Sequence, residues 1–148
     1  KFELIERHDD WKAIIRPNNI NMIDWINLPG DQTYLIGKII EGIQSQLKDG
    51  IAVVSLQKSV GKELGVGGGF SQHLASYYFA IDFEKLTVMK AKEWKGTNPN
   101  GKVYGFQIVD GNIFQSIRPV KKCNRCGGGG FFKGDTCDKC DGKGVMDL

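Results

Sequence analysis

The pattern of apolar and polar positions in the first half of the chain predicts a strand at residues 51–56. This segment reads Ile-Ala-Val-Val-Ser-Leu and is followed by the polar pair Gln57 and Lys58. A nearly unbroken apolar run is typical of a strand that has neighbours on both sides and is covered on both faces. Open α/β sheets bind ligands just beyond the carboxyl ends of their strands, where Gln57 would lie. A buried strand that ends on reaching water explains the same pattern, and the segment alone leaves both interpretations open.

Two further apolar patterns place this strand in a parallel sheet. Residues 20–28 (Ile-Asn-Met-Ile-Asp-Trp-Ile-Asn-Leu) predict a second buried strand, which Pro29 and Gly30 close. Residues 34–47 carry apolar side chains at the i, i+3, i+4, i+7 spacing of a helix with one buried face. A strand, a helix and a strand in this order form the unit of a parallel sheet.

Asp24 lies near the carboxyl end of the strand predicted at residues 20–28, among apolar neighbours. A buried carboxylate is costly unless it is paired or holds a cation, so this position suggests a functional role. An aspartate that faces solvent at the end of a strand is the alternative interpretation.

The middle of the chain predicts a flexible loop and a set of antiparallel strands. Residues 61–69 contain five glycines among nine residues, and the phosphate-binding pattern G-x-x-x-x-G-K-[ST] is absent from the chain. A flexible connection is therefore favoured over a phosphate cradle. After a short helix near residues 70–75 capped by Ser71, we expect strands at residues 77–83, 86–91, 103–109 and 113–117. The last two form a hairpin about Asp110 and Gly111, and we expect all four to be antiparallel additions to the parallel sheet.

Composition and charge bound the class of protein. The 148 residues are 41% apolar and 25% charged, as in a globular domain with one small additional module. A formal net charge of +3 does not by itself argue for nucleic acid. Lysines gather on both sides of residues 96–101, which is most often a solvated face but also suits an anionic partner. The sequence has no membrane-spanning apolar run and no secretory leader, so we expect no membrane partner and a cytoplasmic location.

The four cysteines form the most specific motif. Cys123 and Cys126 make one C-x-x-C knuckle, and Cys137 and Cys140 make a second after a spacer of ten residues. Four thiolates at this spacing suit one tetrahedral structural zinc ion. Because the surrounding residues 119–148 are poor in apolar side chains, zinc is expected to supply most of the folding free energy of this module, on the order of 10 kcal/mol. We predict a four-cysteine zinc ribbon over residues 119–148 and a separate domain over residues 1–118.

The function of the zinc module has two interpretations. It is either a structural staple or a small contact surface for nucleic acid or protein. Cations surround the knuckles, and Phe131 and Phe132 are available to stack on bases; the cations are Lys121, Lys122, Arg125, Lys133, Lys139 and Lys143. Four nearby aspartates offset most of this charge, so a strong electrostatic footprint is not predicted. Each knuckle continues as C-x-x-C-x-G-x-G, and the doubled pattern resembles one zinc unit of the DnaJ cysteine-rich region.

The order of motifs from Ile20 to Phe114 resembles the second half of a RecA-like ATPase core, a P-loop NTPase. The resemblance is carried by Asp24, Gln57, the segment Gly-Gly-Gly-Phe-Ser at residues 67–71, and residues 89–92 before Asn-Pro-Asn-Gly. The hexameric replicative DNA helicases of the DnaB-like type and their phage relatives match best. The resemblance implies a partial RecA-like α/β sheet, DNA replication or recombination as the process, and a bacterial or phage-infected cell as the location.

The resemblance also implies roles for individual residues. Asp24 matches the Walker B aspartate, which holds magnesium on the phosphates of ATP, and Gln57 matches a glutamine that senses the γ-phosphate. Lys90 and Lys92 match the basic pair that reaches the nucleotide site of the neighbouring subunit in a ring. The glycine loop matches a mobile loop that faces single-stranded DNA. The candidate DNA-binding residues are Gly67, Gly68 and Gly69 in this loop and Lys121, Lys122 and Arg125 near the first knuckle.

Two departures from the family pattern bear on activity. The family has arginine where this chain has Lys92, so bidentate contact with phosphate is lost. The Walker A loop and the segment with the catalytic glutamate are missing, and the chain begins at Lys1 rather than Met, as expected of a segment of a longer protein. We therefore expect a segment of an ATP-dependent DNA helicase or translocase that does not hydrolyse ATP alone. The alternative is a non-catalytic module that binds nucleic acid or protein, built on a degenerate α/β domain with a zinc ribbon.

Overall fold

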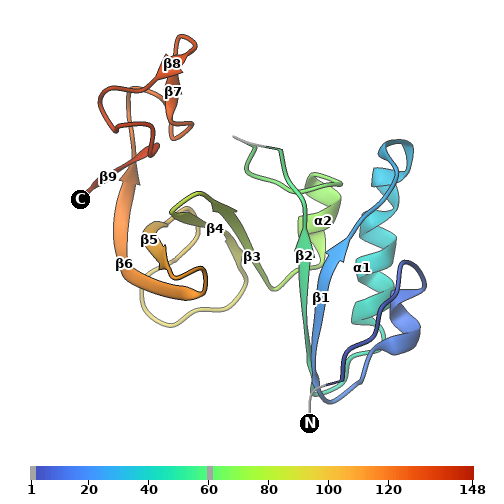
Figure 1. The fold of residues 1–148 in the computed structure, drawn as a ribbon. Coiled ribbons are helices and arrows are strands. Elements are labelled where there is room, and N and C mark those ends of the chain that lie inside the picture. Colours follow the sequence, from blue (N-terminus) through green and yellow to red (C-terminus); the bar gives the residue numbers. More distant parts are fainter. Residues whose placement is uncertain (1–2, 60–61) are drawn as a thin grey trace. The chain divides into compact units, whose positions relative to one another are not determined.

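The computed structural model describes residues 3–59 and 62–148, and these form two compact units (Figure 1). The first unit contains the described residues up to Ser59 together with Leu64–Leu74. The second contains Lys62, Glu63 and Ala75–Leu148. The chain as a whole is mixed α/β, with several sheets and few helices. No helix in the described ranges has the length and apolar character needed to cross a membrane.

The first unit is built on two parallel strands and a connecting helix. Strand β1 (Ile20–Ile26) pairs with β2 (Ile51–Leu56), with Ile20 opposite Ile51 and Ile26 opposite Leu56. The 3₁₀ helices η1 (Trp11–Ile14) and η2 (Gly30–Leu35) precede β1 and the helix α1 (Ile36–Gln44), respectively. The expected strand–helix–strand unit is therefore confirmed. It forms because the apolar period changes from that of a strand to that of a helix and back again.

A cluster of isoleucines makes the core of this unit. The buried side chains come from the residue after η1, from β1 and from α1, and they are Ile15, Ile23, Ile26, Ile36 and Ile43. The glycine loop packs closely against this core, since a Cβ added at Gly67 would lie 1.8 Å from Ile36 Cγ2. Gly67 also has a φ of +85°, a conformation that glycine adopts without strain. The short helix α2 (Gly69–His73) follows, and Ser71, expected as its cap, lies inside it.

Strand β2 is not covered on both faces, contrary to the sequence prediction. Its residues alternate between exposed and half-buried, and Ile51 and Val53 remain 54% and 49% exposed. In the described part of the chain β2 pairs with β1 alone, so its apolar run does not reflect a central position in a wide sheet. Asp24 is likewise exposed, so the prediction of a buried carboxylate was wrong.

The later strands form a sheet of their own. Strands β3 (Tyr77–Asp82), β4 (Lys85–Ala91), β5 (Val103–Val109), β6 (Ile113–Lys122) and β9 (Val145–Asp147) lie in the order β3-β4-β5-β6-β9, and all neighbours are antiparallel. The hairpin about Asp110 and Gly111 is confirmed. The expectation that these strands extend the parallel sheet was wrong, and the RecA-like sheet is not confirmed. The short connections from β3 to β4 and from β5 to β6 allow these strands to pair as antiparallel hairpins.

The cysteine segment is inserted between the last two strands of this sheet. After β6 the chain forms the small hairpin β7 (Phe131–Phe132) and β8 (Asp135–Thr136), and then returns as β9 beside the end of β6 (Figure 1). Val120 pairs with Asp147 and Lys122 pairs with Val145. Strand β6 runs through positions 118 and 119, where the sequence predicted a domain boundary.

Candidate metal centre

The two C-x-x-C knuckles bring four cysteine sulfurs together. All four Sγ atoms lie within 4.8 Å of one another. The Cys123 and Cys137 sulfurs are 3.9 Å apart, and those of Cys126 and Cys140 are 3.7 Å apart. A tetrahedral zinc ion with Zn–S bonds of about 2.3 Å requires sulfurs about 3.8 Å apart. The cluster therefore fits one tetrahedral metal ion, whereas a disulfide would need sulfurs about 2 Å apart.

The knuckles are related to each other by matched hydrogen bonds. The amide of Gly130 donates to the Cys126 sulfur (3.3 Å), and the amide of Gly144 donates to the Cys140 sulfur (3.2 Å). The amide of Cys123 donates to the Gly144 carbonyl (2.9 Å), and that of Cys137 donates to the Gly130 carbonyl (2.8 Å). Gly130 and Gly144 are the second glycines of the two C-x-x-C-x-G-x-G patterns. Each donates a hydrogen bond to a sulfur of its own knuckle and accepts one from a backbone amide of the other knuckle.

Glycine is required at these two positions by space as well as by conformation. A Cβ on Gly130 would lie 2.2 Å from the Gly142 carbonyl oxygen, and a Cβ on Gly144 would lie 2.2 Å from the Gly128 carbonyl oxygen. Both glycines also have positive φ, +80° and +72°. The two knuckles can therefore approach each other closely only through glycine backbone.

The metal-free thiols have shifted pKa values. Burial raises the pKa of the Cys126 thiol, but hydrogen bonds from the Gly128 and Gly130 amides, together with those involving Cys140 and Cys123, outweigh it and lower the pKa to about 7. Burial also raises the pKa of the Cys140 thiol, and its neighbouring cysteines raise it further, to about 12. Amides directed at a sulfur stabilise its thiolate form, which is the form that binds metal.

The surface of the cysteine module has both cations and anions. Arg125 pairs with Asp138 (3.2 Å), and its guanidinium carbon lies 4.9 Å from the centre of the Phe132 ring. Phe131 is exposed. Lys122 forms an ion pair with Glu63. Two of the three basic candidates for DNA contact are therefore neutralised by carboxylates, while Lys121 is exposed on β6.

The sequence grouped Lys85 with the lysines near residues 96–101, but its side chain reaches the metal module from β4. Its Nζ donates to the Gly128 carbonyl oxygen (2.8 Å) and lies 3.5 Å from a carboxylate oxygen of Asp82. Lys85 is only 8% exposed. It lies 43 positions from Gly128 in the chain, and no local pattern indicates a pairing at that separation.

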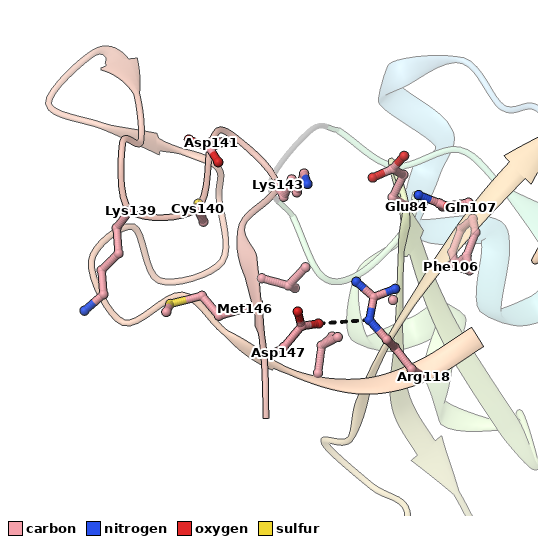
Figure 2. A pocket seen from close by; sticks show the side chains of 13 residues that line it. Glu84, Phe106, Gln107, Arg118, Lys139, Cys140, Asp141, Lys143, Met146 and Asp147 are labelled. Carbon is pink, nitrogen blue, oxygen red and sulfur yellow. Dashed lines mark hydrogen bonds and ion pairs between the residues drawn. The ribbon is translucent and has the colours of Figure 1, made fainter. Parts of the chain in front are cut away.

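A pocket of about 280 Å³ lies between the metal module and the sheet (Figure 2). Phe106, Arg118 and Met146 line it, with charged residues of both signs around them. The Arg118 side chain donates to Asp147 across β6 and β9 (2.9 Å), as the dashed line in Figure 2 shows. The mixed charge gives the pocket no preference for an anion.

Asp24 and Gln57, the predicted nucleotide-site residues of the first unit, lie at the same end of the parallel pair. Ile26, two residues after Asp24, is opposite Leu56, which immediately precedes Gln57. Both side chains are exposed. The Gln57 carbonyl oxygen accepts a hydrogen bond from the amide of Val66, which attaches the glycine loop to the end of β2 (2.8 Å).

The other predicted motor residues are divided between the units. Lys90 and Lys92 belong to β4 and the residue just after it in the second unit, whereas Gly67, Gly68 and Gly69 belong to the first. Burial and the neighbouring charge of Lys92 lower the pKa of Lys90. Gly68 and Gly69 have open space where a Cβ would lie, unlike Gly67. Gly61, the first glycine of the predicted loop, lies outside the described residues.

No family model matches the chain, and no curated protein or solved structure matches it either.

Proposed function

We propose that the chain is a segment of an ATP-dependent DNA helicase or translocase whose C-terminal part is stabilised by one structural zinc ion. The two parts of this proposal rest on different observations, one in each unit, and they are tested separately.

The zinc part is carried by the four sulfurs within 4.8 Å of one another. Cys123, Cys126, Cys137 and Cys140 would hold the ion, and four protein ligands leave no open position for catalysis. The ion would join the end of β6 to the start of β9. The zinc ion would act as a cross-link between these segments, so its removal is expected to affect folding.

Metal analysis tests this part. Protein purified without added metal should contain about one zinc per chain, and Cys137→Ser should lose it. Asn124→Ser, a substitution inside the first C-x-x-C that removes no ligand, is the control. A protein that is folded without metal and carries two disulfides would overturn the zinc proposal.

The motor part is supported by the arrangement of Asp24 and Gln57. Both residues lie at the carboxyl end of a parallel β–α–β unit, which is the end where α/β proteins bind nucleotides. Their exposure leaves them available to a magnesium ion and a phosphate group. Lys90 and Lys92 would act on the nucleotide of a neighbouring subunit in a ring, and Gly67, Gly68 and Gly69 would face single-stranded DNA.

The test uses the protein encoded by the full reading frame that contains this chain. We expect ATP hydrolysis that single-stranded DNA stimulates, and we expect Asp24→Asn and Gln57→Ala each to lower it at least tenfold. Asp49→Asn is the control, because Asp49 is an exposed carboxylate at the opposite end of β2. ATPase rates that neither Asp24→Asn nor Gln57→Ala changes would reject the motor.

A non-catalytic binding module is the second candidate, and the exposed Phe131 together with Arg125 beside Phe132 favours it. Rings and a cation close together suit stacking on an unpaired base. A full reading frame without G-x-x-x-x-G-K-[ST] after a strand would reject the motor and favour this candidate. Binding of a fluorescent single-stranded oligonucleotide that Phe131→Ala weakens, with Phe83→Ala as an exposed aromatic control, would support it directly.

A further inference from the structure

The buried ammonium of Lys85 occupies a central position between the β3–β4 hairpin and the first cysteine knuckle. Lys85 is the first residue of β4, and its register partner across the hairpin is Asp82. It is one of only three polar or charged residues that are buried among those the structure describes. Burying a charge is costly unless it is paired and hydrogen-bonded. The hydrogen bond to Gly128 and the ion pair with Asp82 meet that requirement.

Gly128, which accepts the hydrogen bond from Lys85, takes part in both knuckles. Its amide is directed at the Cys126 sulfur, and its carbonyl oxygen lies where a Cβ of Gly144 would be. Gly144 in turn donates to the Cys140 sulfur (3.2 Å). Gly128 therefore contacts the sheet and both knuckles. Its carbonyl oxygen accepts the hydrogen bond from Lys85 and packs against Gly144 of the second knuckle, and its amide is directed at Cys126 of the first.

Lys85 contacts the metal module through a hydrogen bond to Gly128 (2.8 Å), and the Asp82 carboxylate, 3.5 Å away, offsets its charge. Hydrogen-bond partners outside the ligand set orient the ligands, and removing such a partner typically lowers metal affinity by about 10- to 100-fold. Lys85 reaches the centre through the backbone of Gly128, whose amide is directed at the Cys126 sulfur.

We propose that Lys85 is a positioning residue for the metal centre and that it couples metal occupancy to the order of the β3–β4 hairpin. This inference rests on the proposed zinc site. The coupling works in both directions, because any contact that forms only when both parts are ordered stabilises each part in the presence of the other. Loss of the metal should loosen β4, and loss of the Lys85 ammonium should weaken metal binding.

The first experiment measures zinc affinity by competition with a chromophoric chelator. Lys85→Met, which keeps most of the side-chain volume and removes the ammonium, should bind zinc at least tenfold more weakly than the natural chain. Lys102→Met is the matched control, since Lys102 is exposed and belongs to the same unit. Unfolding is measured on the metal-free and zinc-loaded forms of both variants. An equal loss of stability in the two forms, with zinc affinity within about twofold of the natural chain, would overturn the proposal.

The second experiment needs no variant at Lys85, so it remains decisive if Lys85→Met does not fold. Amide hydrogen exchange is measured on the natural chain with zinc bound and after chelation. The amides of β4, residues 85–91, should exchange at least tenfold faster after chelation. Exchange that increases only in residues 123–147 would overturn the coupling. A natural chain that binds no zinc at all would instead reject the proposed zinc site.

Discussion

The backbone amide of Cys137 donates a hydrogen bond to the carbonyl oxygen of Gly130, 2.8 Å away. The equivalent bond in the other direction joins Cys123 to Gly144 (2.9 Å). Because each knuckle supplies the acceptor for the other, neither turn is complete alone. The metal-binding geometry is consequently a property of the pair, and substitutions in either glycine should affect all four ligands.

Gly130→Ala and Gly144→Ala should each abolish tight zinc binding. The new methyl group would overlap a carbonyl oxygen of the other knuckle, and the residue would be strained by its positive φ. We expect zinc affinity to fall by at least a hundredfold, measured by chelator competition. Gly129→Ala is the matched control, because its nearest contact would be 3.5 Å and its φ is not positive. Equal affinities for Gly129→Ala and Gly130→Ala would contradict the geometry.

Gly67→Ala should destabilise the first unit. Its Cβ would overlap Ile36, a fully buried core side chain, and alanine is disfavoured at a φ of +85°. Overpacking and the left-handed conformation together predict a loss of about 2–5 kcal/mol in the free energy of unfolding. The measurement is denaturant unfolding followed by circular dichroism.

Gly69→Ala is the control for this substitution, because a Cβ there would meet nothing within 4 Å. It should leave stability within about 0.5 kcal/mol of the natural chain. The pair also separates two roles of the loop. A DNA-binding defect in Gly69→Ala with unchanged stability would favour a direct contact with DNA, whereas a stable Gly67→Ala would show that the loop does not pack on Ile36.

The ion pair between Arg118 and Asp147 should contribute little to stability. It joins β6 to β9 at 2.9 Å, but its two side chains are 52% and 76% exposed. Exposed pairs are screened by solvent and typically contribute about 0–1 kcal/mol. Asp147→Asn should therefore change the free energy of unfolding of the zinc-loaded protein by less than about 1 kcal/mol. A larger loss would contradict the expectation that solvent screens this exposed pair.

Local patterns predicted strands β1 to β6, the helices α1 and α2 and the metal ligands, because each of these signals lies within a few residues, but they predicted none of β7, β8 and β9. The period of apolar residues located β1, α1 and β2, and the spacing of Cys123, Cys126, Cys137 and Cys140 identified four sulfurs that do converge. The glycines of the C-x-x-C-x-G-x-G pattern include Gly130 and Gly144, whose amides are directed at sulfur in the structure.

Pairing between elements that are distant in the chain cannot be predicted from local patterns. The apolar run of β2 reads equally well as a central strand or as one of two strands, and only the pairing partner decides. Asp24 is exposed although the residues around it in the sequence are apolar. The burial of Lys85 depends on the contact with Gly128, which the sequence does not encode in any local pattern. The contacts that the sequence did not predict are therefore those between elements that are distant in the chain.

Truncation of a core isoleucine provides the most direct test of the first unit. Ile43 on α1 is 2% exposed and belongs to the isoleucine core, whereas Ile20 on β1 is 72% exposed. Removing a buried isoleucine side chain typically costs about 2–5 kcal/mol, because apolar contacts are lost and a cavity remains. Ile43→Ala should therefore lower the free energy of unfolding by that amount, and Ile20→Ala should lower it by less than about 1 kcal/mol. Unfolding in denaturant measures both variants. A large loss in Ile20→Ala would indicate that the exposed face of β1 is covered in solution, and an unaffected Ile43→Ala would reject the packing of α1 on the parallel pair.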